Sequence, residues 1–160
     1  MRVKQQSDKG FTIIEVVLVL AIAAMILAMV FFALPSLQKS RRDTQRKSDL
    51  GRMLAQLESY AGNNSGNYPA ASAAGMTNAG VFVPTYMTAG GETWQDPSGS
   101  AYTFDFTTAV GTAPTGTGTI MYRTSATCSS TAGLLSSSTS ARDVAAVMVL
   151  EKGYICQGNK

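Results

Sequence analysis

The residue best placed to do chemistry in this sequence is Glu15, a carboxylate inside an otherwise apolar segment. Residues 11–34 read FTIIEVVLVLAIAAMILAMVFFAL, and Glu15 is their only charged side chain. A carboxylate deep in a membrane helix costs about 2.5–3.5 kcal/mol, and less near the membrane edge. A chain that needed only an anchor would be more stable without it. Glu15 is therefore expected either to meet a cationic partner or to reach the headgroups without a further role.

The remaining composition excludes several kinds of active site. The chain has no histidine and two cysteines. Ser–His and Cys–His nucleophiles, histidine-ligated zinc and four-cysteine zinc sites are therefore ruled out. No Gly-rich phosphate loop, carboxylate dyad or calcium-loop spacing occurs, and the serines have no base partner. We expect no enzyme activity, no metal and no cofactor.

The element that carries Glu15 is predicted to be a membrane-spanning helix. At 1.5 Å per residue, residues 11–34 extend over about 36 Å, enough to cross the hydrocarbon core of a bilayer. Residues 1–10 (MRVKQQSDKG) form a charged leader before it. An ordinary secretory signal peptide fits poorly, because the apolar run is too long and no A-x-A-like cleavage site follows. A plain uncleaved anchor is the second alternative.

The junction between leader and helix, KGFTIIE at residues 9–15, resembles the leader junction of type IV prepilins and type II secretion pseudopilins. The resemblance implies that a prepilin peptidase cuts between Gly10 and Phe11 and then methylates the new amino terminus at Phe11. Glycine suits such a site, because it lets the backbone enter a protease cleft without a side chain. The resemblance also implies that Glu15 pairs with the terminal amine of a neighbouring subunit. Two charges in an apolar filament core are tolerable only as a pair, which would set the register between subunits.

Pro35 follows the apolar run and is expected to kink or locally melt the helix, or to end it. Helical periodicity resumes over residues 50–61, with apolar side chains at positions 50, 53, 54, 57, 60 and 61. This favours a kinked continuation of the stem over residues 35–61 rather than a helix boundary. We expect the apolar face of residues 50–61 to pack on a sheet.

The stretch QKSRRDTQRKSD at residues 38–49 is polar all round, which predicts a solvated helix. The alternative is that its basic side chains contact acidic groups on adjacent subunits or lipid headgroups. Asp43 and Asp49 are spaced along the helix to pair with three basic residues, Arg46, Lys47 and Arg52.

Residues 62–160 form the predicted β head. Strands are expected at residues 81–83, 101–107, 119–123, 144–150 and 154–157, with a hairpin turn at 151–153 and a DPSG turn at 96–99. Trp94 is expected in the core or at the sheet edge. The Ser/Thr-rich residues 124–142 read as a solvated loop or a glycosylated patch. The fold class is α+β: a pilin-like roll with one long N-terminal helix packed on a small antiparallel sheet.

Cys128 and Cys156 lie 28 positions apart and either form a disulfide or stay reduced. A disulfide would stabilise the C-terminal region by roughly 3–4 kcal/mol and would require an oxidising compartment. Many pilins have a C-terminal disulfide loop, and the resemblance therefore implies the bonded state.

Charge placement bears on orientation and on partners. Residues 39–52 hold six Lys or Arg and the leader three, so the positive-inside rule alone would place residues 39–52 in the cytoplasm. The resemblance and the cysteines favour a cytoplasmic leader and an external head, which we adopt. Residues 62–160 hold four bases and five acids, a net charge of −1, which does not favour nucleic acid as a partner.

The resemblance implies a structural subunit of a type IV pilus-like filament. The partners are then further copies, other pilins, prepilin peptidase and a pilus assembly platform. The chain would be a single-pass plasma-membrane protein before assembly and part of an extracellular filament afterwards. Filaments of this kind serve twitching motility, adhesion, DNA uptake in competence, or secretion. The alternatives are a secretion pseudopilin, whose major forms are expected to bind calcium through C-terminal acidic residues, and a minor, DNA-binding tip pilin.

Overall fold

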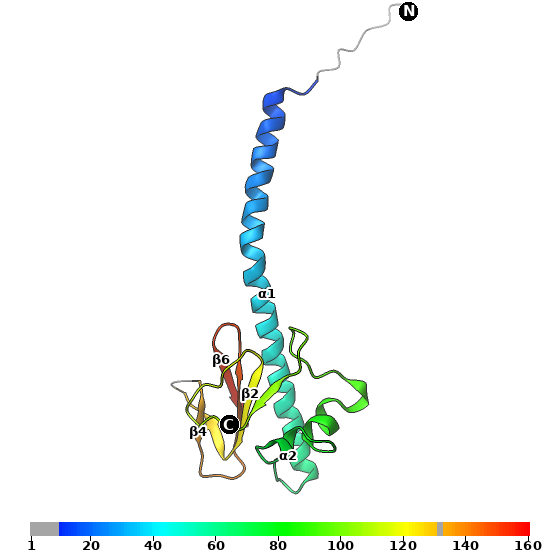
Figure 1. Ribbon diagram of the computed structural model, residues 1–160. Coiled ribbons are helices and arrows are strands. Elements are labelled where there is room, and N and C mark those ends of the chain that lie inside the picture. The colour runs from blue at the N-terminus through cyan, green and yellow to red at the C-terminus, as the bar shows by residue number, and fades with distance from the viewer. Residues whose placement is uncertain (1–9, 131–132) are drawn as a thin grey trace, which may run out of the picture. The chain divides into compact units, whose positions relative to one another are not determined.

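The computed structural model describes residues 10–130 and 133–160. It divides into two compact units, Met1–Gln38 and Lys39–Lys160. Figure 1 shows the helices and strands along the chain. The elements are, in chain order, α1 (Ile13–Asn63), α2 (Ala73–Met76), η1 (Val83–Met87), η2 (Ala89–Gly91), β1 (Thr103–Asp105), β2 (Thr119–Thr124), β3 (Ala126–Cys128), β4 (Leu135–Ser137), β5 (Val144–Val149) and β6 (Tyr154–Gly158).

The first unit consists, in its described part, of the apolar start of α1. Its large side chains are exposed, from 89% at Phe11 to 45% at Leu34, because this stretch is apolar all round and packs on nothing within the unit. By length and composition α1 contains a stretch able to cross a membrane. The predicted leader, residues 1–10, lies outside the described residues except for Gly10.

Helical backbone continues through Pro35, which lies inside α1. The alternatives of a helix boundary or a melted turn at this proline are therefore wrong, and the favoured continuation is confirmed. The accompanying kink stays a prediction, as do the domain limits at residues 34 and 61. The helix itself ends at Asn63.

In the second unit, the predicted apolar face of α1 forms the core. Leu50, Met53 and Leu57 are fully buried, and Ala61 is 6% exposed. Leu50, Met53 and Leu57 pack with side chains of the sheet and of the segment between α1 and β1, as predicted. This cluster includes Met76, Phe82, Met87, Trp94, Tyr102, Ile120, Tyr122, Val144, Ala146 and Met148. Trp94 thus lies in the core.

The main sheet has the strand order β1-β2-β5-β6. β2 pairs antiparallel with β5, and β5 with β6, through the predicted hairpin at residues 151–153. β1, however, runs parallel to β2, so the sheet is mixed rather than purely antiparallel. The expected strand at 101–107 shortens to Thr103–Asp105 for this pairing. The fold class α+β is confirmed.

The expected strand at residues 81–83 is wrong. The backbone is helical from residue 82, and η1 has a proline at its start, Pro84. Proline has a φ suited to a first helical turn and has no N–H to give to a sheet. Phe82 and Met87 still reach the core, since residues five apart share a face of this wider helix.

Two strands, β3 and β4, occur within the stretch that we expected to be a solvated loop. They pair antiparallel with each other as a separate two-stranded sheet. Buried Ala126 and Leu135 pack with Met121, Ala145 and Val147 in a second apolar cluster. Cys128 of β3 is bonded to Cys156 of β6, with 5.7 Å between their Cα atoms. The implied disulfide is confirmed, and it fastens the small sheet to the main one.

We predict that replacing both cysteines, C128S/C156S, lowers the free energy of unfolding by about 3–4 kcal/mol, because the cross-link restricts a loop of 28 positions in the unfolded chain. Urea denaturation of the full chain in detergent measures this, with the fluorescence of Trp94, the single tryptophan, as the signal. Reduction of the unmodified chain should give the same loss. An unchanged midpoint in both cases would contradict the prediction.

Candidate functional site

The start of α1 is built around Thr12 and Glu15. The backbone N–H of Thr12 donates to Glu15 Oε2 at 2.9 Å, and the Thr12 hydroxyl donates to the same oxygen at 2.8 Å. The Glu15 N–H in turn donates to Thr12 Oγ1 at 3.4 Å. This reciprocal arrangement is a capping box, and it follows from threonine and glutamate three residues apart at a helix start. It fixes the direction of the carboxylate without any second chain.

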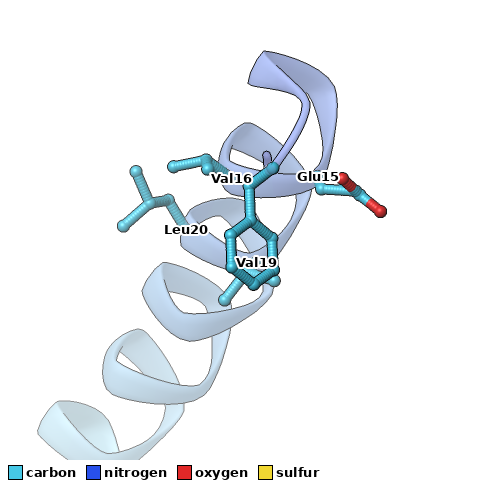
Figure 2. Close-up of a pocket in the computed structure, with 5 residues that line it drawn as sticks. Glu15, Val16, Val19 and Leu20 are labelled. Carbon is cyan, nitrogen blue, oxygen red and sulfur yellow. The ribbon is translucent and has the colours of Figure 1, made fainter. Parts of the chain in front are cut away.

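The capping box uses one oxygen of the carboxylate and leaves the other open. Among the described residues, Glu15 Oε1 accepts no hydrogen bond. Glu15 borders an open apolar groove of about 510 Å³ that is also lined by Phe11, Val16, Val19 and Leu20. Figure 2 shows the carboxylate leaving the helix on the side away from Leu20. An open carboxylate oxygen beside exposed apolar side chains can receive a cation that arrives with an apolar segment.

Gly10 and Phe11 precede this capping box along the chain. Phe11 is 89% exposed, and a Cβ added at Gly10 would meet nothing within 4 Å. The fold of the described residues therefore does not itself require glycine at position 10. Any need for glycine there comes from a partner outside the chain.

The second unit contains a buried ion cluster centred on Arg46, which is only 2% exposed. Its guanidinium binds Asp96 through two hydrogen bonds, Nε to Oδ2 at 2.5 Å and Nη2 to Oδ1 at 2.8 Å. Nη1 donates to Asp43 Oδ1 at 2.9 Å and to Glu151 Oε1 at 3.4 Å. One cation thus connects α1, the DPSG turn before β1, and the β5–β6 turn.

Two further sets of contacts complete this cluster. Arg42 binds both oxygens of Glu151, at 2.5 and 3.1 Å. The Asp43 carboxylate accepts the backbone N–H groups of Glu151 and Lys152 at 2.9 and 3.2 Å. The hairpin turn is therefore held against α1 by side chains and by backbone. A side chain at position 118 would clash with the cluster, because a Cβ on Gly118 would lie 2.8 Å from Asp96 Oδ2.

The charges of the cluster stabilise one another. Hydrogen bonds from Arg46 lower the pKa of Asp96 to about 2, against the opposing effect of burial. Hydrogen bonds from Arg42 lower the pKa of Glu151, and those pairings raise the pKa of both arginines. Asp96, Glu151 and the two arginines are therefore charged at neutral pH. Their contacts hold α1, the DPSG turn and the β5–β6 turn together.

The predicted solvated helix at 38–49 needs correction at this point. Asp43 and Arg46 are buried, and Asp49 accepts a hydrogen bond of 2.7 Å from the Tyr102 hydroxyl. The predicted Asp43–Arg46 pair forms, whereas Arg52 pairs with Glu92 instead. The partners Asp96 and Glu151 lie 50 and 105 positions from Arg46, and no local pattern indicates such contacts.

An exposed apolar helix that starts with the Thr12–Glu15 capping box, together with a disulfide-closed α+β unit, fits a membrane-anchored pilin-type protein. A family model described as the prokaryotic N-terminal methylation motif matches residues 5–31. The chain therefore carries the leader signature of type IV pilins and pseudopilins. That signature is a structural pilin-type motif rather than that of an enzyme family. Comparisons with curated proteins and with solved structures gave no match.

We predict that R46M lowers the free energy of unfolding by about 3–5 kcal/mol, because it leaves buried Asp96 and Asp43 without their cation. Urea denaturation followed by Trp94 fluorescence measures the loss. The matched control is K47M, which removes the neighbouring exposed cation and should change stability by no more than about 0.5 kcal/mol. Equal effects of the two substitutions would show that the cluster does not stabilise the fold.

The low pKa of Asp96 predicts a specific acid sensitivity. The ordinary pKa is 3.8 and the folded value is about 2, so the stabilisation is complete above about pH 4 and is lost as the pH falls towards 2. The loss is about 2 kcal/mol. Urea midpoints measured across this range should fall more steeply for the unmodified chain than for D96N. Parallel pH profiles of the two chains would exclude Asp96 as the group responsible.

Proposed function

We propose that this chain is the structural subunit of a type IV pilus-like surface filament. In this proposal, prepilin peptidase hydrolyses the Gly10–Phe11 bond and the new amine of Phe11 is methylated. The subunit then leaves the membrane and polymerises through α1, on a pilus assembly platform and together with other pilins. The observation that carries the proposal is the leader signature, which runs directly into an exposed apolar helix with an open carboxylate oxygen on Glu15.

The geometry at Glu15 supports its role in assembly. Cleavage would give Phe11 a cationic amine, and Glu15 would then be the fifth residue of the mature chain. The capping box already orients the carboxylate, so the incoming amine of a neighbouring subunit has a fixed acceptor in Oε1. Pairing offsets the cost of each charge in an apolar core. Apolar contacts then supply adhesion between helices, and the ion pair supplies register.

The open surroundings of Gly10 support the proposed cleavage site. The fold of the described residues does not need glycine at position 10, and a glycine there suits an extended backbone in a peptidase cleft. Cleavage at this bond would leave the amine of Phe11 as the group to be methylated, in keeping with the methylation motif at residues 5–31. The disulfide supports a head on the oxidising side of the plasma membrane, with the leader in the cytoplasm and the mature subunit in an extracellular filament.

The contacts of two acidic residues favour a pilin over a calcium-binding pseudopilin. Asp143 binds Lys160 at 2.8 Å and accepts a hydrogen bond from Ser138, while Glu151 binds Arg42. Both C-terminal carboxylates are thus neutralised by the chain's own cations. Within residues 10–130 and 133–160, no group of three or more acidic or cysteine side chains could hold a metal ion.

The head gives little support to a DNA-binding tip subunit. Arg123 donates to the backbone carbonyls of Asp105, Tyr122 and Thr108, and Lys160 is paired with Asp143. Two of the four head cations are therefore occupied in the fold. Few remain for the phosphate contacts on which DNA affinity depends.

We predict that E15A leaves cleavage intact but strongly reduces assembled filaments. Intact mass of the membrane fraction checks cleavage, and the yield of sheared filaments checks assembly. The matched control is T12V, which removes the hydroxyl partner but keeps the carboxylate. T12V should assemble far better than E15A.

Either of two results would contradict this role. Normal filament yield from E15A would show that the carboxylate is not needed for assembly. Equal loss in T12V and E15A would show that Glu15 acts as a helix cap rather than as the acceptor for another subunit.

A further inference from the structure

Four exposed cations surround the membrane-proximal start of the second unit. They are Lys39, Arg41 and Lys47 on α1, and Lys152 on the β5–β6 turn, and they are called the basic collar below. Among the described residues none of the four side chains forms a salt bridge. Lys152 belongs to the group because its backbone N–H is fixed to Asp43 of α1.

These cations have no carboxylate partners because the nearby acidic side chains bind other residues of the fold. Asp43 and Asp96 bind Arg46, and Glu151 binds Arg42 and Arg46. Asp49 accepts the Tyr102 hydroxyl. The acids of this region are thus held in internal contacts, while the collar cations face solvent. The positive charge of the collar is therefore available to an external anion.

The position of the collar along the chain points to the membrane surface. Lys39 follows directly after Gln38, the last residue of the unit that carries the apolar span. The rise from Lys39 to Lys47 is about 12 Å, and a headgroup layer is roughly 5–8 Å thick. Helical side chains lean towards the N-terminus of their helix, which here is the membrane side. Long lysine and arginine side chains can therefore reach back to the headgroups.

The distribution of the cations around α1 favours a lipid surface over a neighbouring protein subunit as their partner. Lys39 and Arg41 are two residues apart, which places them about 200° apart around the helix. One neighbouring subunit would meet one side of the helix only. A headgroup layer surrounds the helix and can meet every side. We infer that the basic collar binds the phosphate groups of anionic lipids in the leaflet next to the head, before the subunit enters a filament.

This inference rests on the membrane insertion contained in the proposed function, but not on filament assembly. Its consequence is regulatory. Contacts with anionic lipid would hold the subunit in the membrane and set the depth of α1. They would have to be released on assembly, so the lipid composition would affect the extraction of subunits.

The test is lipid selectivity of the full chain in vesicles of mixed phosphatidylcholine and phosphatidylglycerol. Spin-labelled forms of each lipid report the composition of the shell around the protein by electron paramagnetic resonance. We expect phosphatidylglycerol to be preferred by roughly five-fold at low salt, the scale of a single cation at an anionic surface, with a decline as salt rises. K39Q/R41Q should lose most of this preference.

R142Q/K160Q is the control, because it removes the same number of positive charges from exposed positions outside the collar and should keep the preference. Of the two, Lys160 is paired with Asp143 and Arg142 forms no salt bridge among the described residues. All chains keep the same leader, so its own lipid contacts cancel in the comparison. Flotation with the vesicles is measured for each chain. A chain that does not float with the vesicles would refute membrane insertion, and with it the proposed function.

For inserted chains, an unchanged preference in K39Q/R41Q would overturn the lipid inference alone. Cross-linking between copies is also compared in pure phosphatidylcholine. If K39Q/R41Q loses this cross-linking but keeps the lipid preference, the collar binds a second copy of the chain, and the lipid inference is overturned. Inorganic phosphate should reduce the preference for phosphatidylglycerol no more strongly than chloride does at equal ionic strength. Stronger displacement by phosphate would indicate a site for free phosphate instead of lipid.

Discussion

The surroundings that this protein needs are set by an apolar helix with a single carboxylate near its start. Its exposed side chains must be covered by lipid or by other helices, and Glu15 must keep a partner in either setting. Thr12 provides that partner in the isolated chain. Moving such a helix from a bilayer into a bundle of similar helices costs little hydrophobic free energy, because both surroundings are apolar. Pairing of the Glu15 carboxylate can then set the register between neighbouring helices.

The second unit is organised around a different charge, the buried guanidinium of Arg46. Buried ion pairs add little net stability compared with apolar packing, but loss of one partner is costly. Here the pairs bring together the stem helix, the turn before β1 and the β5–β6 hairpin. The disulfide fastens β3 to β6 at the edge of the same sheet. Cross-links of this kind suit a small unit whose β3 and β4 are short and polar.

The features that sequence predicts well are those set by local residue patterns. The apolar run, the helical face of α1 at residues 50–61 and the strands β2, β5 and β6 were all predicted from short stretches of sequence, and all are found. The capping box was not predicted, although threonine and glutamate three residues apart at a helix start are a local signal for it. Asp96 and Glu151 could not be predicted as partners of Arg46, because tertiary packing alone brings them together. The polar strands β3 and β4 escaped prediction for a similar reason, since pairing and the disulfide stabilise them rather than composition.

The central claim is that the leader is removed and the mature chain enters a surface filament. The most direct measurement is the intact mass of protein sheared from the surface of the native cells. The account predicts a mass equal to residues 11–160 plus one methyl group, less the two hydrogens lost in the Cys128–Cys156 bond. A chain that still begins at Met1, or a processed chain found in membranes and absent from the sheared fraction, would contradict it.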